Sequence, residues 1–185
     1  MRHVTGSGYG VFGQPVRMGR GTTTAGIIQD EARHDPSRGL VGGFELETRS
    51  PGLPVMAAFL DPGGWGRAFT WALDSYENMA GMWIVGEDLP QETNRSTVNV
   101  DQPDQFSLPS PTVHFCDHPN DVAMRIHAYE RGMAIYDAVG ATRSFTTPPY
   151  PSRHNLCTNR MSENPRDGVV NKWGKTHDIP QLVRV

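Results

Sequence analysis

The sequence predicts an α+β fold, in which a mainly antiparallel β-sheet is backed by helices. Short runs of β-branched and apolar residues follow one another along most of the chain, separated by turn-forming residues. Only two segments show the spacing of apolar residues that is typical of a helix. The 20 glycines and 15 prolines among 185 residues favour turns and short elements. Strands joined by short turns are typical of antiparallel sheets.

Strands are predicted where alternating or continuous apolar residues lie between turn signals. Residues 40–48 alternate, which places Phe44, Leu46 and Thr48 on one face of a strand. Residues 78–87 are apolar on both faces, so we expect them to form a buried central strand. The other predicted strands are residues 2–17, 22–30, 95–100, 111–116 and 141–145.

Two amphipathic helices are predicted. The first follows the turn at residues 61–64, and its core-facing residues are Trp65, Phe69, Ala72 or Leu73, and Tyr76. In the second, Asp117 is the expected N-cap, Pro119 lies in the first turn and Gly140 ends the helix. Its predicted core-facing residues are Val122, Ile126, Tyr129, Met133 and Tyr136.

Composition excludes two classes of partner. The net charge is −3 and no block of five like charges occurs, so we expect no nucleic-acid partner. No apolar run approaches the roughly 20 residues that a membrane span needs. The two cysteines and the lack of a recognisable signal at the N-terminus leave the compartment undetermined between cytoplasm and periplasm.

Two motifs suggest cofactor or metal sites. Residues 8–13 match the dinucleotide fingerprint G-x-G-x-x-G, but no helical periodicity follows, so no dinucleotide site is predicted there. His114, Cys116 and His118 are zinc ligands by type, yet a structural zinc site needs four ligands, and Pro119 turns the chain directly after the third. We therefore predict a strand edge that leads into a helix cap, and no metal site.

The most polar candidate site is the loop from His154 to Met161. A histidine can take a hydroxyl proton near neutral pH, which the oxidation of an alcohol requires while a cofactor receives the hydride. Residue types alone favour a structural histidine, because the sequence identifies no partner residue for His154.

A resemblance to a known family changes that interpretation. Residues 154–161, with Asn164-Pro165, Gly168-Val169-Val170 and Thr176-His177, are similar to the C-terminal signature of the GMC (glucose–methanol–choline) flavin oxidoreductases. Gly81-Met82-Trp83, residues 87–95 and residues 117–121 resemble the substrate domain of the gluconate and sugar dehydrogenase branch. The resemblance implies a substrate-binding-like domain at 1–150 and an incomplete return segment to the FAD domain at 151–185.

The resemblance also implies a reaction. The chain would belong to an FAD-dependent oxidoreductase, a dehydrogenase rather than an oxidase, that acts on CH–OH groups of alcohols or sugars. His154 would be the catalytic base, and Asn155, Thr158 and Arg160 would lie beside the flavin. The expected partners are a small alcohol or sugar and, in the full-length enzyme, an electron-acceptor subunit.

Three departures from the family pattern predict a fragment that is truncated at both ends and inactive alone. The family's dinucleotide fingerprint belongs to the beginning of a longer chain, a second active-site His or Asn would lie beyond Val185, and Cys157 replaces the usual glycine. The alternative hypothesis is a non-catalytic module whose sheet binds a carbohydrate or a partner protein.

Overall fold

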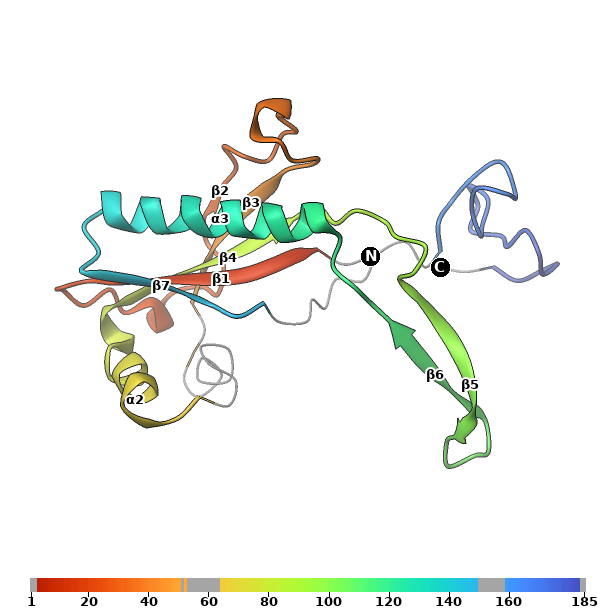
Figure 1. Ribbon diagram of the computed structural model, residues 1–185, viewed down its shortest axis with the longest axis horizontal. Coiled ribbons are helices and arrows are strands. Elements are labelled where there is room, and N and C mark those ends of the chain that lie inside the picture. The colour runs from red at the N-terminus through yellow and green to blue at the C-terminus, as the bar shows by residue number, and fades with distance from the viewer. Residues whose placement is uncertain (1–2, 51, 53–63, 150–158, 184–185) are drawn as a thin grey trace.

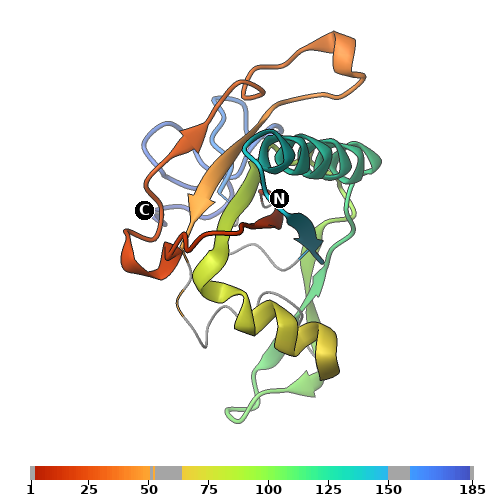
Figure 2. The ribbon, with the colours of Figure 1, turned by 90° about the vertical axis from the view of Figure 1, so that its left-hand side faces the viewer.

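The computed structural model describes residues 3–50, 52, 64–149 and 159–183. A five-stranded antiparallel sheet has the strand order β2-β3-β4-β1-β7. Its strands are β1 (Val4–Val11), β2 (Ile27–Ile28), β3 (Phe44–Arg49), β4 (Met79–Gly86) and β7 (Arg143–Thr147). Two helices, α2 (Gly66–Asp74) and α3 (Pro119–Ala138), lie on opposite sides of this sheet (Figures 1 and 2). The predicted α+β class is confirmed.

A second, two-stranded sheet projects from the first. Strands β5 (Arg95–Pro103) and β6 (Pro109–His114) form an antiparallel hairpin that extends away from the five-stranded sheet (Figure 1). The remaining short elements are the 3-10 helices η1 (Met18–Arg20), η2 (Pro36–Arg38) and η3 (Tyr76–Asn78). Among the described residues, no helix combines the length and the apolar character needed to cross a membrane.

Helix α3 packs on one face of the sheet because strand β1 presents glycines to it. A side chain on Gly6, Gly8 or Gly10 would collide with Tyr129, Met133 or Tyr136 of the helix, respectively. The core on this side of the sheet consists of Val4, Phe44, Leu46, Ile84, Met124 and Ala128. Alternation along the strand therefore directs Thr5, Ser7 and Tyr9 to the opposite face.

Helix α2 covers part of that opposite face. Tyr9, Val11, Met18, Ala72 and Met79 form a second buried cluster, against which Trp71, Leu73, Tyr76 and Phe145 pack. The rings of Tyr9 and Phe145 stack with their centroids 5.5 Å apart, and Trp71 meets Phe145 edge-on at 6.0 Å. The predicted first helix is thus confirmed, although Trp65 precedes it and is 88% exposed.

The predicted cap of α3 is wrong by one residue. His118 is the N-cap, and its Nδ1 accepts a hydrogen bond from the backbone N–H of Asn120 at 3.0 Å. Asp117 instead pairs with Arg125, with 3.0 Å between the carboxylate oxygen and the guanidinium nitrogen.

The predicted core-facing stripe of α3 is only partly correct. Tyr136 is buried, but Val122 and Ile126 are 37% and 53% exposed. The buried residues of the helix are Asp121, Met124, Ala128, Gly132 and Tyr136. The small side chain of Ala128 is fully buried in the core between helix and sheet, which an apolarity count does not register.

Other strand predictions also change in detail. Only Ile27–Ile28 of residues 22–30 forms a strand. Thr48 is exposed, and its hydroxyl accepts hydrogen bonds from the backbone N–H groups of Ala25 and Gly26 at 3.1 and 2.8 Å. The central position of β4, between β3 and β1, is as predicted.

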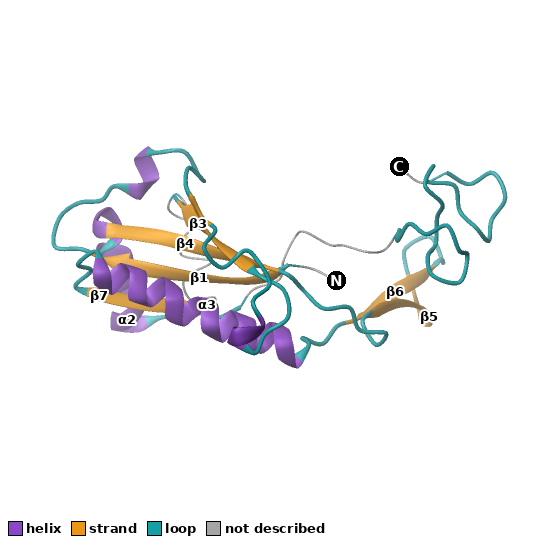
Figure 3. Ribbon diagram, turned by 90° about the horizontal axis from the view of Figure 1, so that it is seen from above, coloured by secondary structure: helices purple, strands orange, loops and turns teal. Residues whose placement is uncertain are grey.

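The last described segment, residues 159–183, is built from turns and isolated bridges. Val170 bridges to Met161 and Thr176, and Lys175 bridges to Val183. This segment lies beyond the hairpin, away from the sheet and its helices (Figure 3). The domain boundary predicted near residue 150 falls in residues 150–158, outside the described residues, and stays a prediction.

Candidate active site

Most of the predicted site lies outside the described residues. This holds for His154, Asn155 and Thr158, and for the neighbouring Cys157. Arg160 is described, and its side chain is exposed. The structure therefore describes the two stretches between which these residues lie in the sequence.

The stretch before His154 is attached by hydrogen bonds to both helix α3 and strand β1. Thr147, at the end of β7, is only 2% exposed. Its carbonyl oxygen accepts a hydrogen bond from the Tyr129 hydroxyl of α3 at 2.8 Å, and its own hydroxyl lies 3.4 Å from the Ser7 carbonyl of β1. Helix and sheet together thus determine where the chain leaves the domain towards His154.

The stretch after His154 is held by its own backbone. The carbonyl oxygen of Arg160 accepts hydrogen bonds from the N–H groups of Val169 and Val170 at 2.8 and 3.2 Å. His177 Nε2 lies 3.0 Å from the carbonyl oxygen of Ser162. Because a carbonyl can only accept, this nitrogen carries the hydrogen. His177 is therefore a structural residue of this segment.

The face of the sheet opposite α3 carries a row of mostly polar residues that ends at Thr147, which we call the polar row. Glu47, Trp83, Ser7 and Thr147 are direct neighbours on four adjacent strands. Strand alternation places Arg49 on this face too, and its guanidinium carbon lies 4.0 Å from the centre of the Trp83 ring. Sequence reasoning missed Arg49. The alternation of β3 could have identified it, because Arg49 is out of phase with the buried Phe44 and Leu46.

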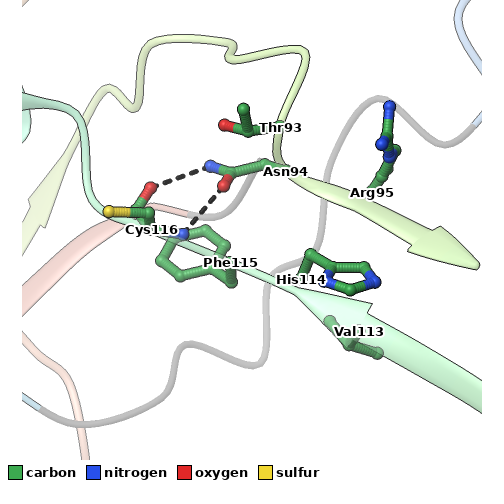
Figure 4. Close-up of a pocket in the computed structure, with 7 residues that line it drawn as sticks. All are labelled: Thr93, Asn94, Arg95, Val113, His114, Phe115 and Cys116. Atoms are coloured by element: carbon green, nitrogen blue, oxygen red, sulfur yellow. Dashed lines mark hydrogen bonds between the residues drawn. The ribbon is translucent and has the colours of Figure 1, made fainter.

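A separate hollow of about 530 Å³ lies at the foot of the hairpin (Figure 4). The Asn94 amide spans it, accepting from the N–H of Cys116 at 2.8 Å and donating to the carbonyl of Cys116 at 3.0 Å. Gln91 donates to the same carbonyl at 2.7 Å. These hydrogen bonds connect the chain before β5 to the chain after β6. The hollow is therefore an open depression whose polar side chains have a structural role.

The three residues that were considered as zinc ligands, His114, Cys116 and His118, lie near this hollow and are not arranged around a common point. His114 Nε2 lies 2.9 Å from the Thr97 hydroxyl, and His118 caps α3. Cys116 is an exposed free thiol. Among the described residues, no three His, Cys, Asp or Glu side chains are arranged to hold a metal ion.

Most of the segment that matches the dinucleotide fingerprint, residues 8–13, belongs to strand β1. Residues 8–11 lie in β1 and are paired with both β4 and β7, and a bend follows them. Phosphate binding by this motif requires a turn and a helix N-terminus, and the space beside Gly8 and Gly10 is filled by Met133 and Tyr136. Arg160, which is the described residue among those predicted beside a flavin, exposes a guanidinium, a group that can donate to flavin or phosphate oxygens.

Comparison with known families identifies the chain. The sequence pattern described as GMC oxidoreductase matches residues 92–185, which is half of the chain and includes the hairpin, α3 and the His154 loop. The chain belongs to the GMC oxidoreductase family. The match confirms the resemblance, and its position corresponds to the C-terminal domain of that family.

Two relatives of this chain are dehydrogenases. The 2-methyl-1,2-propanediol dehydrogenase of Mycolicibacterium austroafricanum is 34% identical over 172 residues, covering 88% of this chain and 31% of that protein. The fructose dehydrogenase large subunit of Gluconobacter japonicus is 34% identical over 102 residues, covering 52% of this chain and 18% of that protein. The chain thus spans less than a third of the length of either relative.

Proposed function

We propose that this chain is the substrate-binding part, with the C-terminal return segment, of an FAD-dependent dehydrogenase that oxidises a CH–OH group. The supporting observation is the family match over residues 92–185, which includes the His154 loop. The two dehydrogenase relatives are named for a diol and a sugar. On that basis we propose that the substrate is a small molecule with several hydroxyl groups.

In this proposal His154 accepts the hydroxyl proton on an imidazole nitrogen. FAD, when bound, supplies the group that receives the hydride. Asn155, Thr158 and Arg160 orient the flavin, with the Arg160 guanidinium donating to its oxygens. Removal of the proton by a positioned base contributes roughly 10²–10⁴-fold to such a reaction.

The polar row on the sheet is the proposed contact surface for the substrate. Trp83 and Arg49 are half-buried in this row, and they offer an aromatic ring for the carbon skeleton and a guanidinium for hydroxyl groups. Position supports this, because the row ends at Thr147, the last residue of the strand that leads to His154. An electron-acceptor partner is also proposed, since one relative is named as the large subunit of its enzyme.

The test needs a complete enzyme, made by placing this chain where it aligns in the 2-methyl-1,2-propanediol dehydrogenase. We expect His154→Asn to retain flavin and to lower kcat for diols and sugars by roughly 10²–10⁴-fold, with loss of the acidic limb of the pH profile. His177→Gln keeps a donor for the Ser162 carbonyl and is the matched control, with kcat within a few-fold of the parent.

An unchanged kcat and pH profile in His154→Asn would remove the proposed base. The alternative hypothesis, a non-catalytic binding module, is tested with the same substitution. In that case the 185-residue chain would bind a sugar or a partner protein with the same affinity before and after the substitution.

A further inference from the structure

The β5–β6 hairpin has two chemically different faces. Directly opposed residues of an antiparallel pair lie on the same face, and successive residues alternate. The pairs Arg95–His114, Thr97–Thr112 and Asn99–Ser110 therefore form a polar face. The hydrogen-bonding contact between Thr97 and His114 at 2.9 Å agrees with this assignment. The pairs Ser96–Val113 and Val98–Pro111 form the other face, which is mainly apolar.

The apolar face is the more exposed one. Val98 and Val113 are each 71% exposed, whereas Thr97, Asn99 and Thr112 on the polar face are half-buried. Further apolar side chains continue along the hairpin, because Val100, Phe106 and Leu108 are 74%, 72% and 61% exposed. We call Val98, Val100, Phe106, Leu108, Pro111 and Val113 the hairpin patch. Exposed apolar side chains gathered on one hairpin are typical of a site that another surface covers.

The hairpin is held in shape at both ends. At its foot, the Asn94 amide bonds both backbone groups of Cys116. At its tip, the carboxylate of Asp104 accepts hydrogen bonds from the N–H groups of Phe106 and Leu108 at 2.8 and 3.0 Å. A two-stranded hairpin has little stability of its own in water. These clasps present the hairpin patch in one conformation, which lowers the entropic cost of binding.

The position of the hairpin indicates which surface covers it. The hairpin and residues 159–183 lie at the same end of the molecule, away from the sheet and both helices (Figures 1 and 3). Residues 159–183 also expose apolar side chains, including Trp173 at 76% and Val183 at 56%. In the proposed function this segment returns to the FAD-binding part, so both exposed sets belong to the side where that part lies.

We propose that the hairpin patch docks onto an apolar surface of the FAD-binding part of the dehydrogenase, within the roughly two thirds of the relative's length that this chain does not span. The inference rests on the proposed function. Other occupants fit less well. Residues 95–114 contain one arginine, no lysine and two aspartates, which disfavours an anionic lipid surface. Pro109 and Pro111 lack N–H donors, which disfavours strand addition by a second copy along β6.

The test compares two double variants of neighbouring residues on opposite faces. Val98→Lys/Val113→Lys places charges on the hairpin patch, and Asn99→Lys/Thr112→Lys places the same charges on the polar face. Each is made in the 185-residue chain and in the enzyme that carries this chain in the 2-methyl-1,2-propanediol dehydrogenase. The rest of that dehydrogenase is also expressed as a separate flavin-loaded polypeptide, and its binding to the chain is measured.

We expect the patch variant to bind the flavin-loaded polypeptide at least about tenfold more weakly than the parent chain, because a buried unpaired charge is costly. The complete enzyme should also lose flavin on dilution. The polar-face variant should match the parent in both measurements. Melting of the 185-residue chain alone should be unchanged in either variant, since these side chains are exposed or half-buried there; if the double patch variant unfolds, Val113→Lys replaces it.

The two proposals fail in different ways. Binding and flavin retention that are equal in all variants would overturn the docking while the enzyme's activity still supports the function. Binding that depends on the patch in an enzyme without dehydrogenase activity would support the docking and overturn the function. A dimer of the chain that dissociates in the patch variant, without any binding to the flavin-loaded polypeptide, would identify a second copy as the occupant and overturn the docking.

Discussion

At the residue scale, strand β1 carries glycines on the face towards α3 and larger side chains on the opposite face. Its even-numbered glycines admit Tyr129, Met133 and Tyr136 of α3, and its odd-numbered residues, Ser7 and Tyr9, face the opposite side. The same alternation brings Ser7 into line with Trp83 and Thr147. Small residues on one face thus give close helix packing, and the residues on the other face are buried as well.

The glycines differ in how much change they tolerate. In Gly10→Ala, the new Cβ would lie 2.5 Å from Cδ1 and 2.7 Å from Cγ of the buried Tyr136 ring, which cannot move aside. We expect a loss of about 1–3 kcal/mol in the free energy of unfolding, measured by urea titration. Gly8→Ala meets only the flexible end of Met133, so its loss should be smaller. Equal losses would contradict the packing argument.

Tyr136 should also make stability depend on alkaline pH. Burial raises the pKa of its phenol, with a smaller contribution from Tyr9. The folded state then keeps the proton above about pH 10, where an unfolded tyrosine loses it. The stability supplied by the neutral phenol is therefore complete below about pH 10 and decreases above it.

The variant Tyr136→Phe tests this. The hydroxyl donates to the Ala80 carbonyl at 3.0 Å, so its removal should cost about 1 kcal/mol at neutral pH. The difference between parent and variant should shrink as the pH rises above about 10, in thermal melts across that range. A difference that stays constant would show that the Tyr136 phenol titrates as it does in the unfolded chain.

At the element scale, the start of α3 shows why a cap can be misplaced from sequence. Asp117 is the better capping residue by type, but Pro119 is fixed as the first helical residue, which assigns the cap to His118. Asp117 is then free to pair with Arg125 two turns into the helix. The position of the proline was the stronger signal.

The cap has a measurable consequence. His118→Ala removes the acceptor for the Asn120 N–H and should lower the free energy of unfolding by about 1 kcal/mol. His118→Asn supplies a preferred capping side chain and should recover most of that loss. Chemical denaturation of the three proteins measures both changes. If alanine and asparagine behave alike, the histidine does not act as the cap.

At the scale of the whole molecule, two sets of apolar side chains are exposed at the end away from the sheet. In the return segment, the side chains of Val169 and Val183 are 42% and 56% exposed. In the sheet, by contrast, the Trp83 ring is half-buried beneath the Arg49 guanidinium. Sheet, hairpin and return segment thus differ in how fully each is covered within this chain.

The sequence by itself determined the fold class, most of the strands, both helices and the family. Those features depend on local periodicity, on turn residues and on motifs within short stretches, all of which are readable along the chain. It also marked His154 and Arg160 by their place in one loop. It could not reveal that the Arg49 guanidinium lies on the Trp83 ring or that the hairpin patch is exposed.

Only the tertiary structure decided those points, because each depends on pairing between distant residues. Strand register brings Ser7, Trp83 and Thr147 into one row, and register is not encoded in any one strand. The rotation of α3 follows from glycines more than 100 residues earlier in the chain, which accept its tyrosines. The exposure of Val98 and Val113 follows from the direction in which the hairpin leaves the sheet, and no local pattern specifies that direction.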